Sequence, residues 1–255
     1  MEARQSCERL TDEKYWSDYY ECHRQVTPSR ESIEVAGSRF DGCWEEFHRV
    51  AGNPTTVCEI GCYPGRYLAY VASKFNLGAV GIDFNKDTET VLATLKEMGV
   101  KETRVVSSDF LTHTPMKKSE MVFSLGFIEH FENVDLVLDR HLEFLTEKGA
   151  LFIVVPNMRG LVRPYKLLAD RDNLRIHNLE AMRPAVFRNF AERNGLKLHF
   201  LKSRGSFPWN LHHTPNFPQR VLYCSAKLCG KLLDPFIQKY PSSLYSAELL
   251  ALFSR

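Results

Sequence analysis

Short apolar runs alternate with amphipathic stretches along the middle of the chain, between about residues 55 and 157. The runs TTVCEI, AVGID, RVVSS, MVFSL and ALFIVVPN predict strands, because each is short and rich in β-branched or aliphatic residues. The intervening segments RYLAYVASKF, TETVLATLKEMG and NVDLVLDRHLEFLTEKG repeat apolar residues at three- and four-residue intervals, which predicts helices. Strands that alternate with such helices indicate βαβ units, and the continuous run LFIVV suits a strand covered on both faces. We therefore predict an α/β fold with a mostly parallel sheet.

The pattern at the start of the chain is helical throughout. Residues 1–54 are predicted to form an N-terminal helical cap, with Thr11 as the expected N-cap of a helix rich in tyrosine and tryptophan. A second helix is expected over about residues 30–50, before the sequence GNP breaks the pattern.

Beyond residue 157 the alternation is interrupted by two expected insertions, at about 158–182 and 204–240. Between them, RPAVFRNFAERNG predicts a helix and LKLHFL a strand, and SAELLALFSR predicts the last strand. Residues 218–233 have the pattern of an amphipathic helix, which we expect to pack on the sheet; contact with a membrane or a partner subunit is the alternative. The main domain is predicted to occupy residues 55–255.

Composition narrows the classes of partner and compartment. The 255 residues carry 33 basic and 31 acidic side chains, well mixed, so there is no basic block of the kind that binds nucleic acid. The seven cysteines are odd in number and show no CxxC pair, which favours reduced thiols over a disulfide framework or a zinc site. No apolar run approaches the roughly 18 residues of a membrane span, and the polar N-terminus does not resemble a signal peptide. We expect a cytoplasmic protein without a nucleic-acid partner or an integral membrane segment.

The segment VCEIGCYPGRY is the candidate for binding chemistry. A strand ends in the acidic Glu59, a turn with Gly61 and Gly65 follows, and a helix begins. Glycine allows close backbone approach to a ligand and a tight entry into the helix. Such a turn lies outside the carboxyl end of a parallel strand, where open α/β sheets bind ligands.

This segment resembles motif I, [D/E]-x-G-x-G-x-G, of the class I S-adenosylmethionine-dependent methyltransferases. The chain departs from the motif at Tyr63, which stands where the middle glycine is common, so its side chain must point away from the cofactor or form part of its wall. Three later segments resemble the family as well: GIDF at the end of the second strand, SSDF after the third, and SLGFIEHF after the fourth. A fourth, LTEKGALF, resembles the turn before the fifth strand.

The resemblance implies a Rossmann-like sheet of seven strands, mostly parallel with the last strand antiparallel, and helices on both faces. It implies S-adenosylmethionine as the cofactor, with Asp83 accepting hydrogen bonds from the ribose hydroxyls and Asp109 from the adenine amino group. The cofactor-binding residues that it implies are Glu59, Gly61, Cys62, Tyr63, Gly65, Asp83, Phe84, Asp109, Phe110, Ser124, Leu125 and Gly126.

The acceptor is harder to infer. The tetrapeptide [N/D/S]-P-P-[Y/F] of amino-methylating DNA and glutamine enzymes is absent, which leaves a small molecule or a sugar. We expect methylation of a hydroxyl, with His130 as the candidate catalytic base because it follows the fourth strand. The expected substrate-side residues are Trp16, Tyr19, Tyr20, Glu129, Arg159 and His177. No metal is expected, because Gly126 replaces the first acid of the E-x-x-E-H pattern of relatives thought to hold one.

Other functions stay open at this point. One is methylation of a small-molecule amine, which needs only to arrive neutral. A second is a non-catalytic cofactor-binding subunit, and a third is an NAD-dependent oxidoreductase, although the fingerprint G-x-G-x-x-G is not met. A homodimer is also compatible with the sequence.

Overall fold

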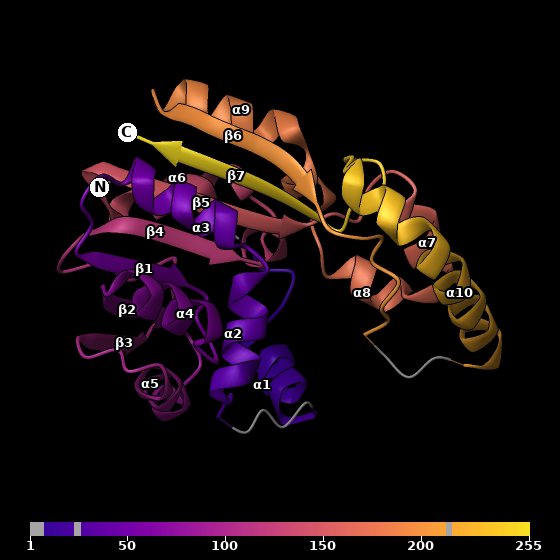
Figure 1. Ribbon diagram of the computed structural model, residues 1–255, viewed down its shortest axis with the longest axis horizontal. Coiled ribbons are helices and arrows are strands. Elements are labelled where there is room, and N and C mark those ends of the chain that lie inside the picture. Colours follow the sequence, from indigo (N-terminus) through magenta and orange to yellow (C-terminus); the bar gives the residue numbers. More distant parts are fainter. Residues whose placement is uncertain (1–7, 23–26, 213–215) are drawn as a thin grey trace.

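A computed structural model describes residues 8–22, 27–212 and 216–255 (Figure 1). Its centre is a seven-stranded sheet in the order β3-β2-β1-β4-β5-β7-β6. The strands β1 to β5 pair in parallel, and β7 runs antiparallel to both of its neighbours, β5 and β6. The strands are β1 (Thr56–Ile60), β2 (Gly78–Asp83), β3 (Thr103–Ser107), β4 (Ser119–Leu125), β5 (Leu145–Pro156), β6 (Lys197–Arg204) and β7 (Glu248–Ser254). The predicted fold class is therefore confirmed.

Helices cover both faces of this sheet. The helices of the described residues are α1 (Glu13–Cys22), α2 (Arg30–Ser38), α3 (Asp41–Val50), α4 (Arg66–Phe75), α5 (Thr88–Glu97), α6 (Val134–Phe144), α7 (Val162–Ala169), α8 (Arg171–Arg175), α9 (Pro184–Arg193) and α10 (Phe217–Lys239), with the short 3₁₀ helices η1 (Ile128–His130) and η2 (Leu179–Met182). The helices α3, α4 and α5 pack on one face, and α6 and α9 on the other.

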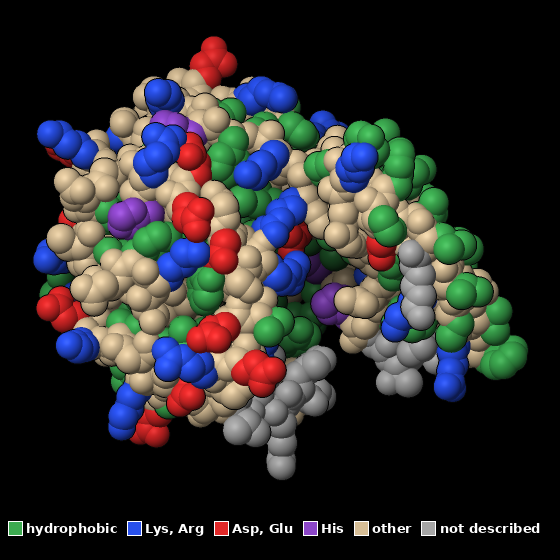
Figure 2. All heavy atoms as spheres, in the orientation of Figure 1, with side chains coloured by type: hydrophobic (Ala, Val, Ile, Leu, Met, Phe, Trp, Pro, Cys, Tyr) green, Lys and Arg blue, Asp and Glu red, His purple; other side chains and the backbone are tan. Residues whose placement is uncertain are grey.

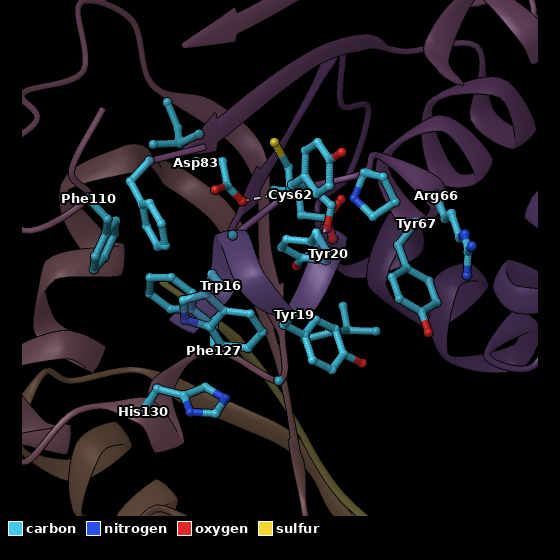
Figure 3. Close-up of a pocket in the computed structure, with 18 of the residues that line it drawn as sticks. Trp16, Tyr19, Tyr20, Cys62, Arg66, Tyr67, Asp83, Phe110, Phe127 and His130 are labelled. Atoms are coloured by element: carbon cyan, nitrogen blue, oxygen red, sulfur yellow. Dashed lines mark hydrogen bonds between the residues drawn. The ribbon is translucent and has the colours of Figure 1, made fainter. Parts of the chain in front are cut away.

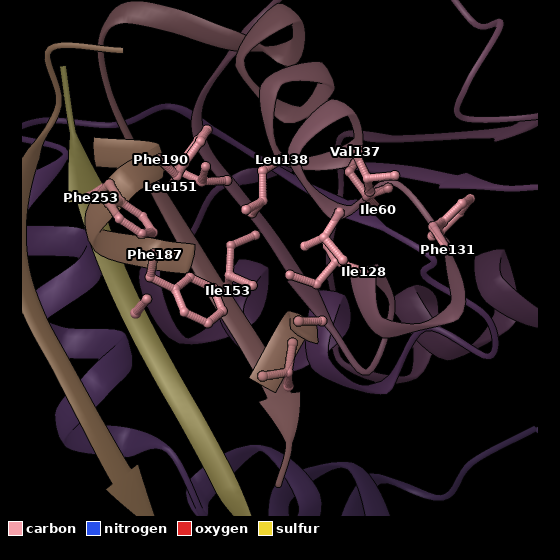
Figure 4. Close-up of a cluster of buried hydrophobic side chains, with 14 of the residues drawn as sticks. Ile60, Ile128, Phe131, Val137, Leu138, Leu151, Ile153, Phe187, Phe190 and Phe253 are labelled. Carbon is pink, nitrogen blue, oxygen red and sulfur yellow. The ribbon is translucent and has the colours of Figure 1, made fainter. Parts of the chain in front are cut away.

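The strand β5 shows why helices cover both faces of the sheet. Successive side chains of a strand point to opposite faces. Leu151 and Ile153 accordingly lie in the cluster beneath α6 and α9 (Figure 4), while Phe152 packs with Trp44 of α3 on the other side. All three strand residues are fully buried, which is the environment that the continuous apolar run predicted.

Three local predictions need correction. The N-cap of α1 is Asp12, whose carboxylate accepts the backbone N–H of Tyr15 at 2.7 Å, while the hydroxyl of Thr11 accepts the indole N–H of Trp16. The segment 30–50 forms two helices, α2 and α3, instead of one. The strand β5 begins at Leu145 instead of after Gly149, because the buried Leu145 already pairs with Ser119 of β4.

The helix α10 also differs from expectation. It is longer than predicted, since Asn216 and Gln219 form a capping box before it and it continues to Lys239. It does not pack on the sheet, whose faces are already covered; it lies beside α7, beyond the carboxyl ends of the parallel strands (Figure 1). Within the described part of the chain, no helix combines the length and the apolar character needed to cross a bilayer.

Candidate active site

The turn after β1 is shaped by its two glycines. Gly61 has a φ of +74°, and a Cβ there would lie 2.6 Å from the ring of Phe127. Gly65 has a φ of +95°, and its Cβ would lie 3.0 Å from Val91 of α5. Glycine is needed at both places, because the backbone is left-handed and the neighbouring side chains are close. At Gly61 the close neighbour is thus a phenylalanine that helps to form the site.

Two acids hold this turn in place, the buried Glu59 and the half-buried Asp83. One carboxylate oxygen of Glu59 accepts the backbone N–H of Leu68 at 2.9 Å, which fastens the start of α4 to β1. The carboxylate of Asp83 accepts the N–H groups of Tyr63 and Asn85, each at 2.9 Å. Burial raises the pKa of Glu59, with a further contribution from the charge of Asp83, and burial likewise raises the pKa of Asp83.

The side chain of Tyr63 forms part of the wall of the site, one of the two placements that the departure from motif I allowed. Its hydroxyl donates to the N-cap residue of α5, Asp87, at 3.2 Å. Its ring packs against Tyr20 with 4.5 Å between the centroids. The tyrosine therefore links the turn to α1 instead of blocking the cavity.

A cavity of about 280 Å³ lies over the ends of β1 and β2, beneath α1 (Figure 3). Aromatic side chains of α1 point into it, namely Trp16, Tyr19 and Tyr20, and Phe127 faces them. The predicted residues that line this cavity are Glu59, Gly61, Cys62, Tyr63, Asp83, Phe84, Phe110, Leu125, Gly126 and His130, together with the three aromatic residues of α1. The lining residues that sequence reasoning missed are Arg9, Pro64, Arg66, Tyr67, Ile82, Ser108, Phe127 and Phe131.

Three predicted cofactor residues do not line the cavity. Gly65 supports the turn from behind, and the buried hydroxyl of Ser124 lies 3.1 Å from Nε2 of His141. Asp109 forms an ion pair with Arg9 and accepts the N–H of Leu111 at 2.8 Å. Arg9 lies about a hundred positions earlier in the chain, so no local pattern could have indicated this pair.

A second cavity, of about 320 Å³, adjoins the first. The residues that line both are Trp16, Tyr19, Tyr67, Leu125, Gly126 and His130. Glu129 and His177 line only the second cavity, on the side away from the glycine turn. Arg159 lines neither, and its guanidinium donates instead to the backbone oxygen of Leu179 at 3.4 Å.

Glu129, His130 and His177 form an acceptor cluster in this second cavity. One ligand atom of each lies within 4.8 Å of the other two. Nδ1 of His130 lies 3.0 Å from the carbonyl oxygen of Ile176, and Nδ1 of His177 lies 2.6 Å from that of Asn173. A carbonyl oxygen only accepts, so both Nδ1 atoms carry the proton and each neutral ring keeps a lone pair on Nε2.

The electrostatics keep both rings of this cluster neutral. Burial, with the charge of neighbouring His177, lowers the pKa of His130 to about 3, and burial lowers that of His177 to about 4. Burial also raises the pKa of Glu129 to about 8. Oε2 of Glu129 is buried without a hydrogen-bond partner among the described residues, and Oε1 lies 3.8 Å from Nε2 of His130. Such a carboxyl and two imidazoles offer lone pairs to an N–H donor, and the same donor set suits a divalent metal ion.

No family model matches this chain. A probable (S)-tetrahydroprotoberberine N-methyltransferase of Papaver bracteatum is 26% identical over 100 residues, which cover 38% of this chain and 28% of the relative's own length. The structure of coclaurine N-methyltransferase bound to N-methylheliamine and S-adenosylhomocysteine (SAH) covers 99% of this chain and 77% of its own, at 12% identity and a TM-score of 0.56.

A third likeness is to the N-methyltransferase NodS of Bradyrhizobium japonicum in complex with SAH. It covers 93% of this chain and 98% of its own, at 12% identity and a TM-score of 0.53. Both structures are similar to this chain over nearly its whole length at only 12% sequence identity, so what they establish is architecture. The chain has the fold of the class I S-adenosylmethionine-dependent methyltransferases.

Proposed function

We propose that this protein is an S-adenosylmethionine-dependent N-methyltransferase that acts on a small-molecule amine. The observation that carries the proposal is the acceptor cluster, in which Glu129, His130 and His177 present lone pairs to one point in the second cavity. An amine or ammonium brings the N–H donors that such a cluster needs, and the unpartnered Oε2 of Glu129 is a place for one of them.

The first cavity suits the cofactor. The carboxylate of Asp83 lines it next to the glycine turn, and the aromatic rings of Trp16, Tyr20 and Phe127 offer faces to a positively charged sulfonium. When bound, S-adenosylmethionine supplies a methyl group already activated by that sulfonium. The protein then has to align the acceptor and exclude water, and α1 covers the cavity for that purpose.

The pKa values favour an amine over the hydroxyl that we expected from the sequence. A base with a pKa of about 3, such as His130, is some seven pH units too weak to deprotonate even a phenol, whose pKa is about 10. A carboxyl with a pKa of about 8 is mostly protonated at pH 7, so only its ionised fraction can act as the base. An ammonium with a pKa of about 10 would pass its proton to ionised Glu129 at a cost of about 3 kcal/mol. The nitrogen would then hold a free lone pair for the methyl group that bound S-adenosylmethionine would supply, with SAH as the leaving group, while the two neutral imidazoles accept the remaining N–H groups of the amine.

The similarities agree with this assignment. The Papaver relative and both structures described above are of proteins named as N-methyltransferases, and both structures contain SAH. The match to the Papaver protein covers a minor part of that protein, so its substrate is not transferred to this chain.

The test is a methyl-transfer assay with labelled S-adenosylmethionine and paired panels of amines, alcohols and phenols of matched shape. We expect transfer to amines alone, and loss of at least a hundredfold in kcat in Glu129→Gln with SAH affinity unchanged. Glu132→Gln, an exposed carboxylate three positions along the chain, is the matched control and should keep full activity. Transfer to alcohols or phenols but not to amines would refute the proposal.

A further inference from the structure

The helix α10 has one side packed on the protein and one side exposed. On the packed side, a Cβ at Gly230 would lie 2.3 Å from the indole nitrogen of Trp209, and Ile237 is only 7% exposed. α10 lies beside α7, and the two helices form one lobe of the molecule (Figure 1). The glycine therefore lets the helix lie close against the segment before it.

The other side of α10 is an exposed apolar stripe, defined by Phe217, Val221, Leu228, Leu232 and Phe236. Their side chains are 80%, 51%, 68%, 82% and 59% exposed. Intervals of four and seven residues place them along one side of a helix. Hydrophobic side chains gather along the outer edge of this lobe (Figure 2). A continuous exposed apolar surface of this kind marks a site of interaction with a membrane or another protein.

Basic residues run beside the stripe. Arg220 and Lys227, both exposed, each precede a stripe residue by one position and are seven residues apart, so they form a row along one edge of it. The single acidic residue of α10 is Asp234, and one of its carboxylate oxygens is buried. An apolar face edged by cations is complementary to a lipid surface with anionic headgroups. Pairing of α10 with α10 of a second copy would instead bring these cations together without matching acids.

We propose that α10 docks this protein on anionic membranes, with the apolar stripe inserted among the acyl chains near the headgroups. The segment before α10 also contributes to the second cavity, because His212 lines that cavity. The same segment is tied to α7, since the backbone oxygen of Trp209 accepts the hydroxyl of Tyr165 at 2.6 Å. Docking would thus hold one wall of the second cavity beside the bilayer. The proposal does not depend on the chemistry of the acceptor.

The test is flotation of the full chain with vesicles made either of phosphatidylcholine alone or of equal parts phosphatidylcholine and phosphatidylserine. We expect binding to the anionic vesicles, weakened by salt. The double variant Leu228→Glu/Leu232→Glu should lower the partition coefficient at least tenfold, because two leucines that insert among the acyl chains become charged. The variant Met116→Glu is the matched control, since Met116 is 81% exposed, lies far from α10 in the sequence and should bind as the wild type does.

A second variant pair tests the charge. Arg220→Ala/Lys227→Ala should reduce binding to anionic vesicles about tenfold and leave binding to phosphatidylcholine unchanged. All substitutions are at exposed positions, so the thermal midpoint should stay within a few degrees of the wild type. No flotation of the wild type, or equal flotation of Leu228→Glu/Leu232→Glu, would overturn the proposal. So would a wild-type dimer that Leu232→Glu dissociates in the absence of any lipid binding, which would make the stripe an interface between copies.

Discussion

Glu129→Gln should make the protein more stable at neutral pH while it removes activity. Glu129 is 1% exposed, and burial raises the pKa of its carboxyl from 4.5 to about 8. Because the folded-state pKa is above the unfolded one, the folded state binds more protons between these values. Stability is therefore lost as the pH rises through that window, by about 1.4 kcal/mol per pH unit.

The magnitude follows from the width of the window. At pH 7 the wild type has lost about 3 kcal/mol that it retains near pH 4.5. Glutamine has no proton to lose, so the variant avoids this cost, while the other buried acids are common to both proteins and cancel in the comparison. For a chain of this size, the difference corresponds to a thermal midpoint about 6–12 °C higher than the wild type at pH 7, and close to it at pH 4.5.

The assay is thermal unfolding of the wild type, Glu129→Gln and the exposed control Glu132→Gln at several pH values from 4.5 to 8. The control should follow the wild type throughout. A difference between Glu129→Gln and the wild type that does not grow with pH would refute the reasoning, because Glu129 would then ionise as an ordinary carboxyl group does.

Four further results are expected. Asp83→Ala should lower SAH affinity at least tenfold by calorimetry with the fold retained, and unchanged affinity would contradict the assignment of the first cavity. Gly61→Ala should lower the free energy of unfolding in urea by at least about 2 kcal/mol more than Gly99→Ala does. Both glycines have a positive φ, but only the Cβ at Gly61 would meet Phe127. Equal losses of stability would contradict this. His130→Gln should unfold at lower pH than the wild type. The pKa of His130 is lower in the folded than in the unfolded protein, so the wild type loses stability as the pH falls from 6.5 towards 3, and the variant does not. Identical acid midpoints would count against the burial of His130 as a neutral ring. Turnover should be unaffected by EDTA if the acceptor cluster holds the amine, whereas loss on chelation and rescue by a divalent ion would assign the cluster to a metal.

Much of the architecture can be derived from the sequence, because it depends on local periodicity. The alternation of apolar runs and amphipathic stretches determines which segments become strands and helices, and parallel pairing then brings the ends of β1 and β2 together. For this reason the glycine turn and Asp83 could be assigned to one site from the sequence alone, and both line the same cavity. The same reasoning missed the start of β5 at Leu145, where pairing with a neighbouring strand decides the boundary.

The acceptor side of the site depends on contacts between distant segments, which only the tertiary structure decided. His177 lies 47 positions after His130, and η2 has to pack against η1 before the two rings can meet. Arg9 reaches Asp109 in the same way, and of this ion pair Arg9 is the partner that lines the cavity. Leu232 is likewise exposed because other helices already cover both faces of the sheet, which leaves α10 no sheet surface to pack on. Periodicity predicts which side of a helix is apolar, but what covers that side is determined by the rest of the fold.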